Sequence, residues 1–176
     1  MKWSSVICVL GGAALVAVAL AFGPYLPLSE LSIASGGMLD EAPRSTAATV
    51  RTHFESIGPE GRGLYRSHFF FDLAFLTANA LVLFGLLRLA LARLPWPRSL
   101  GRTLLSVPWS FAALDLAENV AISRLLSSWQ SPAGSWTAVA SFTTQAKFAS
   151  FGLAVLATLI ALASWAWTAW RGSRRP

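Results

Sequence analysis

The chain has 176 residues, of which 55% are hydrophobic and only 12% are charged. This balance excludes an ordinary soluble globular protein, and the length predicts one domain, residues 1–176. The net charge of +6 does not indicate nucleic-acid binding, because the basic residues are spread over separate loops rather than gathered in one patch. We therefore expect an integral membrane protein.

Four stretches of the chain are long and apolar enough to cross a hydrocarbon core, which needs roughly 20 residues per helix. Val6–Phe22 and Phe148–Trp170 contain no charged residue at all. The third stretch carries Asp115 and Glu118, each of which costs about 2.5–3.5 kcal/mol at a helix centre on insertion scales. We expect an all-α membrane four-helix bundle, with spans at about residues 4–22, 64–91, 103–123 and 145–170.

Residues 23–63 form the expected first outer loop. They open with Gly23, Pro24 and Pro27 and continue into the Ser- and Gly-rich stretch Ser32–Gly37. These residues favour turns, so we expect irregular structure in this part of the loop.

A short amphipathic helix is expected later in the same loop, over residues 45–57. Val50, Phe54 and Ile57 recur there at i, i+4 and i+7, and Gly58 is a typical C-terminal stop. We expect the apolar face of this helix to lie on the outer membrane surface.

The distribution of basic residues predicts the orientation. The two termini and the loop between spans two and three contain eight cations and no carboxylate: Lys2, Arg88, Arg93, Arg98, Arg102, Arg171, Arg174 and Arg175. The other two connecting segments balance five cations with five carboxylates. Because cytoplasmic loops are enriched in Lys and Arg, we expect a multi-pass cell-membrane protein with both termini in the cytoplasm.

The first apolar stretch has a rival interpretation as a cleavable signal peptide, because Lys2 precedes it. Its length exceeds that of most signal-peptide cores, and no clean small-x-small cleavage site follows it. An uncleaved span is therefore the preferred interpretation.

Cysteine and histidine are too scarce for several kinds of chemistry. Cys8 is the only cysteine, which excludes an intramolecular disulfide, a C-x-x-C redox pair and a thiolate metal site. The two histidines are His53, which we expect to face solvent, and His68. We expect no metal site and no cofactor.

Polar residues inside the expected spans fall on particular helix faces. At 100° per residue, helix two places Arg62, Tyr65, His68 and Asp72 in one sector, together with Asn79. On helix three, one face carries Asp115, Glu118 and Asn119 at i, i+3 and i+4, and Lys147 lies at the outer end of helix four. A rise of 1.5 Å per residue brings these groups to similar depths. We expect one buried polar cluster in the outer half of the bundle.

Three functions are compatible with this cluster, because ionisable groups inside a membrane are expensive and mark functional sites by default. The first is binding of a lipid headgroup or small amphiphile, with Arg62 and Lys147 as cationic anchors oriented by the carboxylates. The second is an enzyme in which Asp115, Glu118 or Asp72 transfers protons on an isoprenoid- or sterol-like substrate.

The third function is that of a structural or accessory membrane subunit. Asp115 or Glu118 would then pair with Lys147, Asp72 would pair with Arg62, and the polar groups would only fasten helices together. The expected partners are membrane lipids and a small amphiphilic ligand, with a second copy of the chain or a partner membrane protein left open, and no nucleic acid.

Short motifs in residues 39–122 resemble those of a group of small four-span membrane proteins whose activity is not established. They are Gly61-Arg62-x-x-Tyr65 followed by Asp72, and then Pro108 followed by Asp115-x-x-Glu118-Asn119. The general arrangement is also similar to that of the sterol isomerase and sigma-2 receptor group, which implies four spans with acidic residues around an internal cavity.

Overall fold

The structure is a computed structural model that describes residues 2–173, so Arg174 and Arg175 lie outside the described residues. Every regular element in this range is helical, which confirms the all-α expectation. The elements in chain order are α1 (Lys2–Phe22), α2 (Tyr25–Ser32), the 3₁₀ turn η1 (Ile33–Ser35), α3 (Ala47–Ser56), α4 (Gly58–Leu91), α5 (Arg98–Ser127) and α6 (Gly134–Ser173).

Three of these helices are long and apolar enough to cross a membrane: Trp3–Phe22 within α1, all of α4 and all of α6. With 34 and 40 residues, α4 and α6 are about 51 Å and 60 Å long, well beyond a hydrocarbon core of about 30 Å. Both begin earlier than the expected spans, at Gly58 and Gly134. The helices thus indicate a membrane protein.

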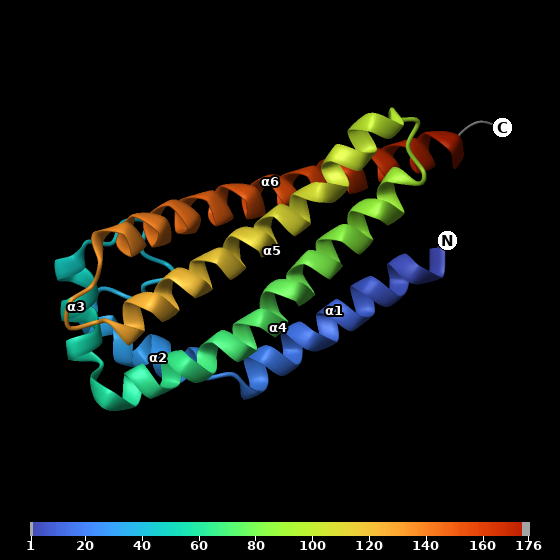
Figure 1. Cartoon of the computed structure of the whole chain (residues 1–176). Helices are drawn as coiled ribbons and strands as arrows, with labels where there is room; N and C mark the ends of the chain where they lie inside the picture. The colour runs from blue at the N-terminus through green and yellow to red at the C-terminus, as the bar shows by residue number, and fades with distance from the viewer. Residues whose placement is uncertain (1, 174–176) are drawn as a thin grey trace.

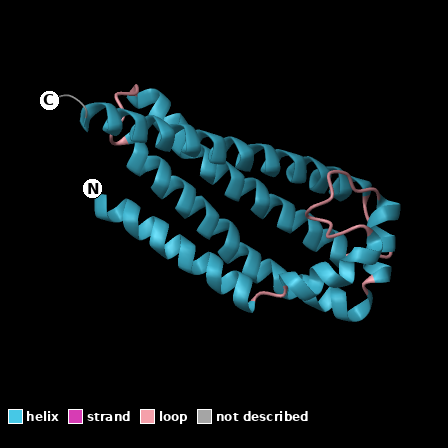
Figure 2. Cartoon of the chain, turned by 180° about the vertical axis from the view of Figure 1, so that it is seen from behind, coloured by secondary structure: helices cyan, strands magenta, loops and turns pink. Residues whose placement is uncertain are grey.

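The four long helices lie side by side in the order α1, α4, α5, α6 (Figure 1). α1 packs on α4, and α5 packs on both α4 and α6. The first residues of α1 and the last residues of α6 lie at the same end of the bundle, and α2 and α3 cover the opposite end. The view from behind shows the loops gathered at these two ends (Figure 2). We call the end with α2 and α3 the outer end.

Two glycines let α1 approach α4 closely. A Cβ atom on Gly12 would lie 2.7 Å from the carbonyl oxygen of Ala78, and one on Gly85 would lie 2.8 Å from that of Ser5. Gly11, by contrast, faces open space. Such close backbone contact through small residues is typical of packed membrane helices.

A hydrophobic core at the outer end holds α3 against the bundle. Val50 and Phe54 are fully buried and Ile57 is 4% exposed, in a cluster that also includes Leu28 and Leu125. The amphipathic helix therefore exists, but its apolar face is covered by protein. The expectation that this face lies on the membrane surface is wrong, because the helix packs on the end of the bundle instead.

Local signals set the bounds of α3. At its start, the Thr46 hydroxyl accepts from the backbone N–H of Thr49 and the Thr49 hydroxyl accepts from that of Thr46, which forms a reciprocal cap. At its end, Gly58 adopts φ +66°, as the stop signal predicts, and α4 begins there without a connecting loop.

Two expectations about the outer loop are wrong. Residues 25–35 form α2 and η1 rather than irregular structure, because Pro27 lies in the first helical turn, where no backbone N–H is needed, and Leu28 is fully buried. His53 does not face solvent: it is 2% exposed, and its Nδ1 lies 2.7 Å from the Ser35 hydroxyl. Burial lowers the pKa of His53 to about 4.

Candidate functional site

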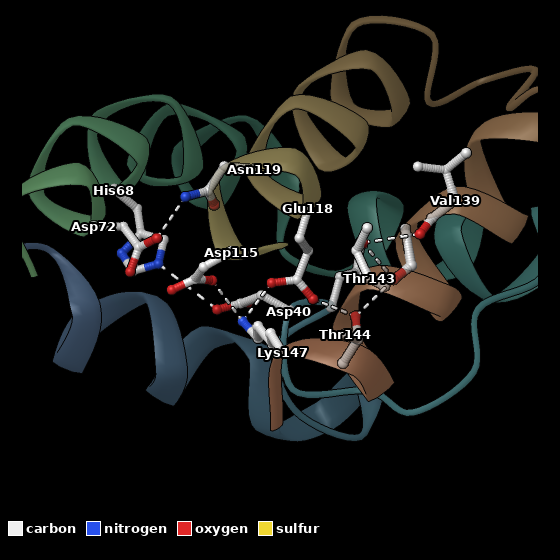
Figure 3. A network of polar contacts seen from close by, with 12 residues as sticks. Asp40, His68, Asp72, Asp115, Glu118, Asn119, Val139, Thr143, Thr144 and Lys147 are labelled. Carbon is white, nitrogen blue, oxygen red and sulfur yellow. Dashed lines mark hydrogen bonds and ion pairs between the residues drawn. The ribbon is translucent and has the colours of Figure 1, made fainter. Parts of the chain in front are cut away.

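A buried ion cluster joins α5 to α6 in the outer half of the bundle (Figure 3). Lys147 Nζ of α6 lies 3.0 Å from Asp115 Oδ1 of α5 and also contacts the carboxylate of Glu118. The hydroxyl of Thr144, one turn before Lys147, donates to Glu118. The side chains of Lys147, Asp115 and Glu118 are 9%, 6% and 0% exposed. Each charge therefore has an opposite charge beside it in a site that water barely reaches.

A second polar contact joins α4 to α5. Asn119 Nδ2 donates to Asp72 Oδ2 at 2.5 Å. Asn119 is one residue after Glu118, so α5 turns one polar side chain toward α4 and another toward α6. The two contacts together tie all three helices at one depth.

A third polar contact involves the outer loop. His68 Nε2 of α4 lies 3.8 Å from Asp40 Oδ2, too far for a hydrogen bond but close enough for an ion pair when the imidazole is protonated. Burial raises the pKa of the Asp40 carboxyl, but its interaction with His68 and the charge of Lys147 outweigh burial and hold the pKa below its ordinary value. Asp40 therefore stays ionised although it is enclosed.

Hydrogen bonds from several helices hold the loop segment that carries Asp40. The backbone N–H of Leu39 donates to the Tyr65 hydroxyl at 2.8 Å, and Tyr25 donates to Glu41 at 2.8 Å. Further along, Gln145 of α6 donates to the carbonyl oxygen of Pro43 at 3.0 Å. Met38 and Leu39, which directly precede Asp40, are buried. The segment is thus a strap across the outer end of α4 and α6.

Beneath the strap lies a pocket of about 360 Å³. Its outer part is polar and its remaining wall is mostly aromatic, contributed by α1, α4, α5 and α6. The lining residues with polar side chains are Tyr25, Asp40, Glu41, His68, Asp72, Asn79, Asp115 and Lys147. The apolar lining consists of Ala19, Leu20, Phe71, Phe75, Phe111, Phe148 and Phe151, with Gly23 at the end of α1. This volume and amphipathic lining are typical of a small-molecule site.

Six of the eight residues expected in the polar cluster do come together: His68, Asp72, Asp115, Glu118, Asn119 and Lys147. The other two have different surroundings. Arg62 lies over the Trp129 ring, 4.5 Å from its centroid, and donates to the carbonyl oxygen of Phe54. Tyr65 is fully buried but is engaged by the strap rather than by the cluster.

Sequence reasoning missed three residues that shape the site. Asp40 and Glu41 were counted only as loop charges, and Thr144 was not considered. One signal was present for the strap: Met38 and Leu39 interrupt an otherwise polar loop next to the two acidic residues. Apolar residues at that point indicate a segment that folds back onto protein.

No metal centre is formed by the described residues, in which no group of three or more His, Cys, Asp or Glu side chains could hold an ion. Comparison of the chain with protein families, curated proteins and solved structures found no match. The resemblance carried by the motifs in residues 39–122 therefore stays a prediction, and function is argued from the geometry of the pocket.

Proposed function

We propose that this chain is a four-span protein of the cell membrane, with both termini cytoplasmic, that binds a small amphiphile in the pocket beneath the strap. Support for four spans comes from α5, whose 30 residues are about 45 Å long and which packs on both α4 and α6. A membrane crossed by its two neighbours would also enclose α5. The start of α1 and the end of α6 lie at the same end of the bundle, which agrees with an even number of spans (Figure 1).

The amphipathic pocket carries the proposal for binding. Its outer part offers charged and hydrogen-bonding side chains, whereas Phe75, Phe111 and Phe151 line the part that lies deeper along the helices. Asn79 also lines that deeper part, and its amide N–H donates to the carbonyl oxygen of Phe75. A molecule with one polar end and one apolar body would satisfy both parts at once. A uniformly polar ligand would leave the aromatic wall in contact with water, and a hydrocarbon would leave the buried Asp40 Oδ1 without a hydrogen-bond partner.

The other two functions account for less of the site. A purely structural role explains the Lys147 ion pairs and the Asn119–Asp72 bond, which fasten helices. It does not explain the pocket, or why the enclosed Asp40 and His68 lie beside it. Proton transfer by Asp115 or Glu118 is disfavoured because both carboxylates are already engaged by the Lys147 ammonium group.

The decisive experiment narrows the pocket without touching its polar end. Leu20 of α1 and Phe148 of α6 line the pocket yet are 52% exposed each, so tryptophan is tolerated at both positions. The variant Leu20→Trp/Phe148→Trp should lose an amphiphile that co-purifies with the wild type in mild detergent, as seen by native mass spectrometry and extraction. The matched variant Leu10→Trp/Phe142→Trp changes exposed residues on the same two helices outside the pocket and should retain it.

Equal ligand content in the two variants, or no ligand in any preparation including the wild type, would refute binding in this pocket. The topology is tested separately by fusing a reporter that is active only in the cytoplasm to each terminus. Both fusions should be active if four helices span, and one should be silent if α5 does not.

A further inference from the structure

We infer that the pocket selects a ligand whose polar end is a protonated primary or secondary amine. This inference rests on the proposed function and specifies the chemistry of the same site. It differs from the expectation of an anionic headgroup held by Arg62 and Lys147, and the difference follows from where those two cations lie.

Neither expected cation is free to hold an anion. Arg62 is absent from the pocket lining and lies over Trp129. Lys147 does line the pocket, but it is already placed between two carboxylates, at 3.0 Å from Asp115 and in contact with Glu118. A ligand carboxylate or phosphate would be a third anion around one ammonium group, and like charges in such a site repel strongly.

The lining instead has an excess of negative charge. Of the described residues that form it, Asp40, Glu41, Asp72 and Asp115 are carboxylic acids, and Lys147 is the one Lys or Arg. Glu41 is exposed to water, but if His68 is also counted as a cation, the three enclosed carboxylates of Asp40, Asp72 and Asp115 still outnumber the two positive groups. Uncompensated charge in a site of low dielectric is costly, so a bound cation would stabilise the arrangement.

Hydrogen-bonding capacity points to a cation with N–H groups. His68 is 6% exposed and lines the pocket, yet neither of its ring nitrogens has a hydrogen-bond partner among the described residues. Asp40 Oδ1 is likewise buried without one. In a neutral imidazole whose Nε2 proton faces Asp40, His68 Nδ1 is an acceptor. These two acceptors match an ammonium N–H and cannot be satisfied by a quaternary ammonium group.

Aromatic rings complete the site. Tyr25, Phe71 and Phe75 line the same pocket as the carboxylates. The electron-rich face of an aromatic ring attracts a cation within about 6 Å, most strongly where water is excluded. The deeper phenylalanines then accommodate the apolar body attached to the amine.

The test is calorimetric titration of the purified full chain in a nonionic detergent at neutral pH with matched probes: phenylbutylamine, phenylbutanol, phenylbutanoate and phenylbutyltrimethylammonium. The four share one apolar body and differ in the polar end. We expect the amine to bind about tenfold more tightly than the alcohol, as for one additional ionic contact, and the carboxylate to show no binding. The quaternary ammonium should bind more weakly than the primary amine.

Substitutions connect the selectivity to the site. Asp72→Asn should lower the affinity for the amine about tenfold and leave that for the alcohol unchanged, because the new amide oxygen can still accept from Asn119. Asp40→Asn is a second variant with the same expectation. Glu30→Gln removes an equal charge from an exposed position of α2 outside the pocket and should change neither affinity.

The outcomes separate this inference from the proposed function. If the alcohol binds as tightly as the amine, or the carboxylate binds most tightly, the pocket is a binding site but amine selectivity is refuted. A quaternary probe equal to the amine refutes the requirement for N–H groups. If none of the four probes binds, the proposed function and the inference fail together.

Discussion

Replacing Lys147 with methionine removes the cation that holds the two α5 carboxylates. Methionine keeps the length and apolar stem of lysine, so the main change is loss of charge at a position that is 7% exposed. Asp115 then loses its 3.0 Å ion pair, while Glu118 keeps only the hydroxyl of Thr144. Breaking a buried ion pair on one side costs about 3–5 kcal/mol, because the remaining charge is left without compensation. We expect Lys147→Met to lower the free energy of unfolding by about this amount.

Two comparison variants make the measurement specific. Lys147→Met/Asp115→Asn/Glu118→Gln removes all three charges and should recover most of the loss, since a neutral buried site is no longer penalised. Arg51→Met breaks the exposed pair of Arg51 with Glu55, whose side chains are 60% and 51% exposed, and should cost less than about 1 kcal/mol.

The assay is equilibrium unfolding in mixed micelles with increasing sodium dodecyl sulfate, followed by circular dichroism. A loss below about 1 kcal/mol for Lys147→Met would refute the reasoning, because it would mean that water or another cation already compensates the carboxylates. A triple variant as unstable as the single one would refute it too, since the loss would then come from altered shape rather than from unpaired charge.

Three further predictions concern stability and the residues outside the pocket. Gly12→Ala should destabilise the fold by about 1–3 kcal/mol, because its Cβ would lie 2.7 Å from a carbonyl oxygen of α4, whereas Gly11→Ala faces open space and should be neutral or slightly stabilising in the same unfolding assay. Because the pKa of His53 is lowered to about 4 in the folded protein, its contribution to stability is present above pH 6.5 and is lost as pH falls toward 4. His53→Phe should therefore shift acid unfolding, measured by fluorescence, to lower pH, and an unchanged midpoint would contradict burial of the neutral imidazole. Arg62→Met should cost about 1–3 kcal/mol through its lost contacts with Phe54 and Trp129 but leave amphiphile binding intact, and a loss of binding at full stability would return Arg62 to the site.

The parts of the site on helices could be predicted because helical geometry is local. A period of 3.6 residues fixes which side chains share a face, and a rise of 1.5 Å per residue fixes their depth. From these two quantities alone, the polar residues of α4, α5 and α6 were expected in one cluster, with Lys147 beside Asp115 or Glu118, and knowing the loop structure was unnecessary for that. The pairing suggested for Asp72 was with Arg62, whereas Asp72 accepts from Asn119.

The same reasoning misplaced Arg62, because two residues that share a helix face need not be in contact with each other. Arg62 shares a sector with His68, but it lies about 9 Å further toward the outer end of α4, at 1.5 Å per residue. Its long side chain bonds to α3 and stacks on the ring of Trp129, which follows α5. Nothing local in the sequence indicates these partners.

Asp40 could not be placed for a different reason. Its position depends on the strap, which is held by contacts between residues distant in sequence, such as the bond from Leu39 to Tyr65. Periodicity carries no information about a segment without regular structure. The loop was therefore interpreted as solvent-exposed, although it supplies one of the four carboxylates of the pocket.

Hydropathy likewise treats α5 as the least apolar of the long helices, because it adds the cost of Asp115 and Glu118 residue by residue. In the folded bundle those costs are offset by Lys147, which is on a different helix and also lowers the apolar character of α6.

Because Lys147 is paired in this way, the net charge of the whole chain does not predict the charge that its pocket presents to a ligand. The net charge of +6 would favour an anionic ligand, yet Lys147, the one Lys or Arg among the described lining residues, is already neutralised. The proposed preference for an amine therefore follows from how the buried charges are paired and not from their sum.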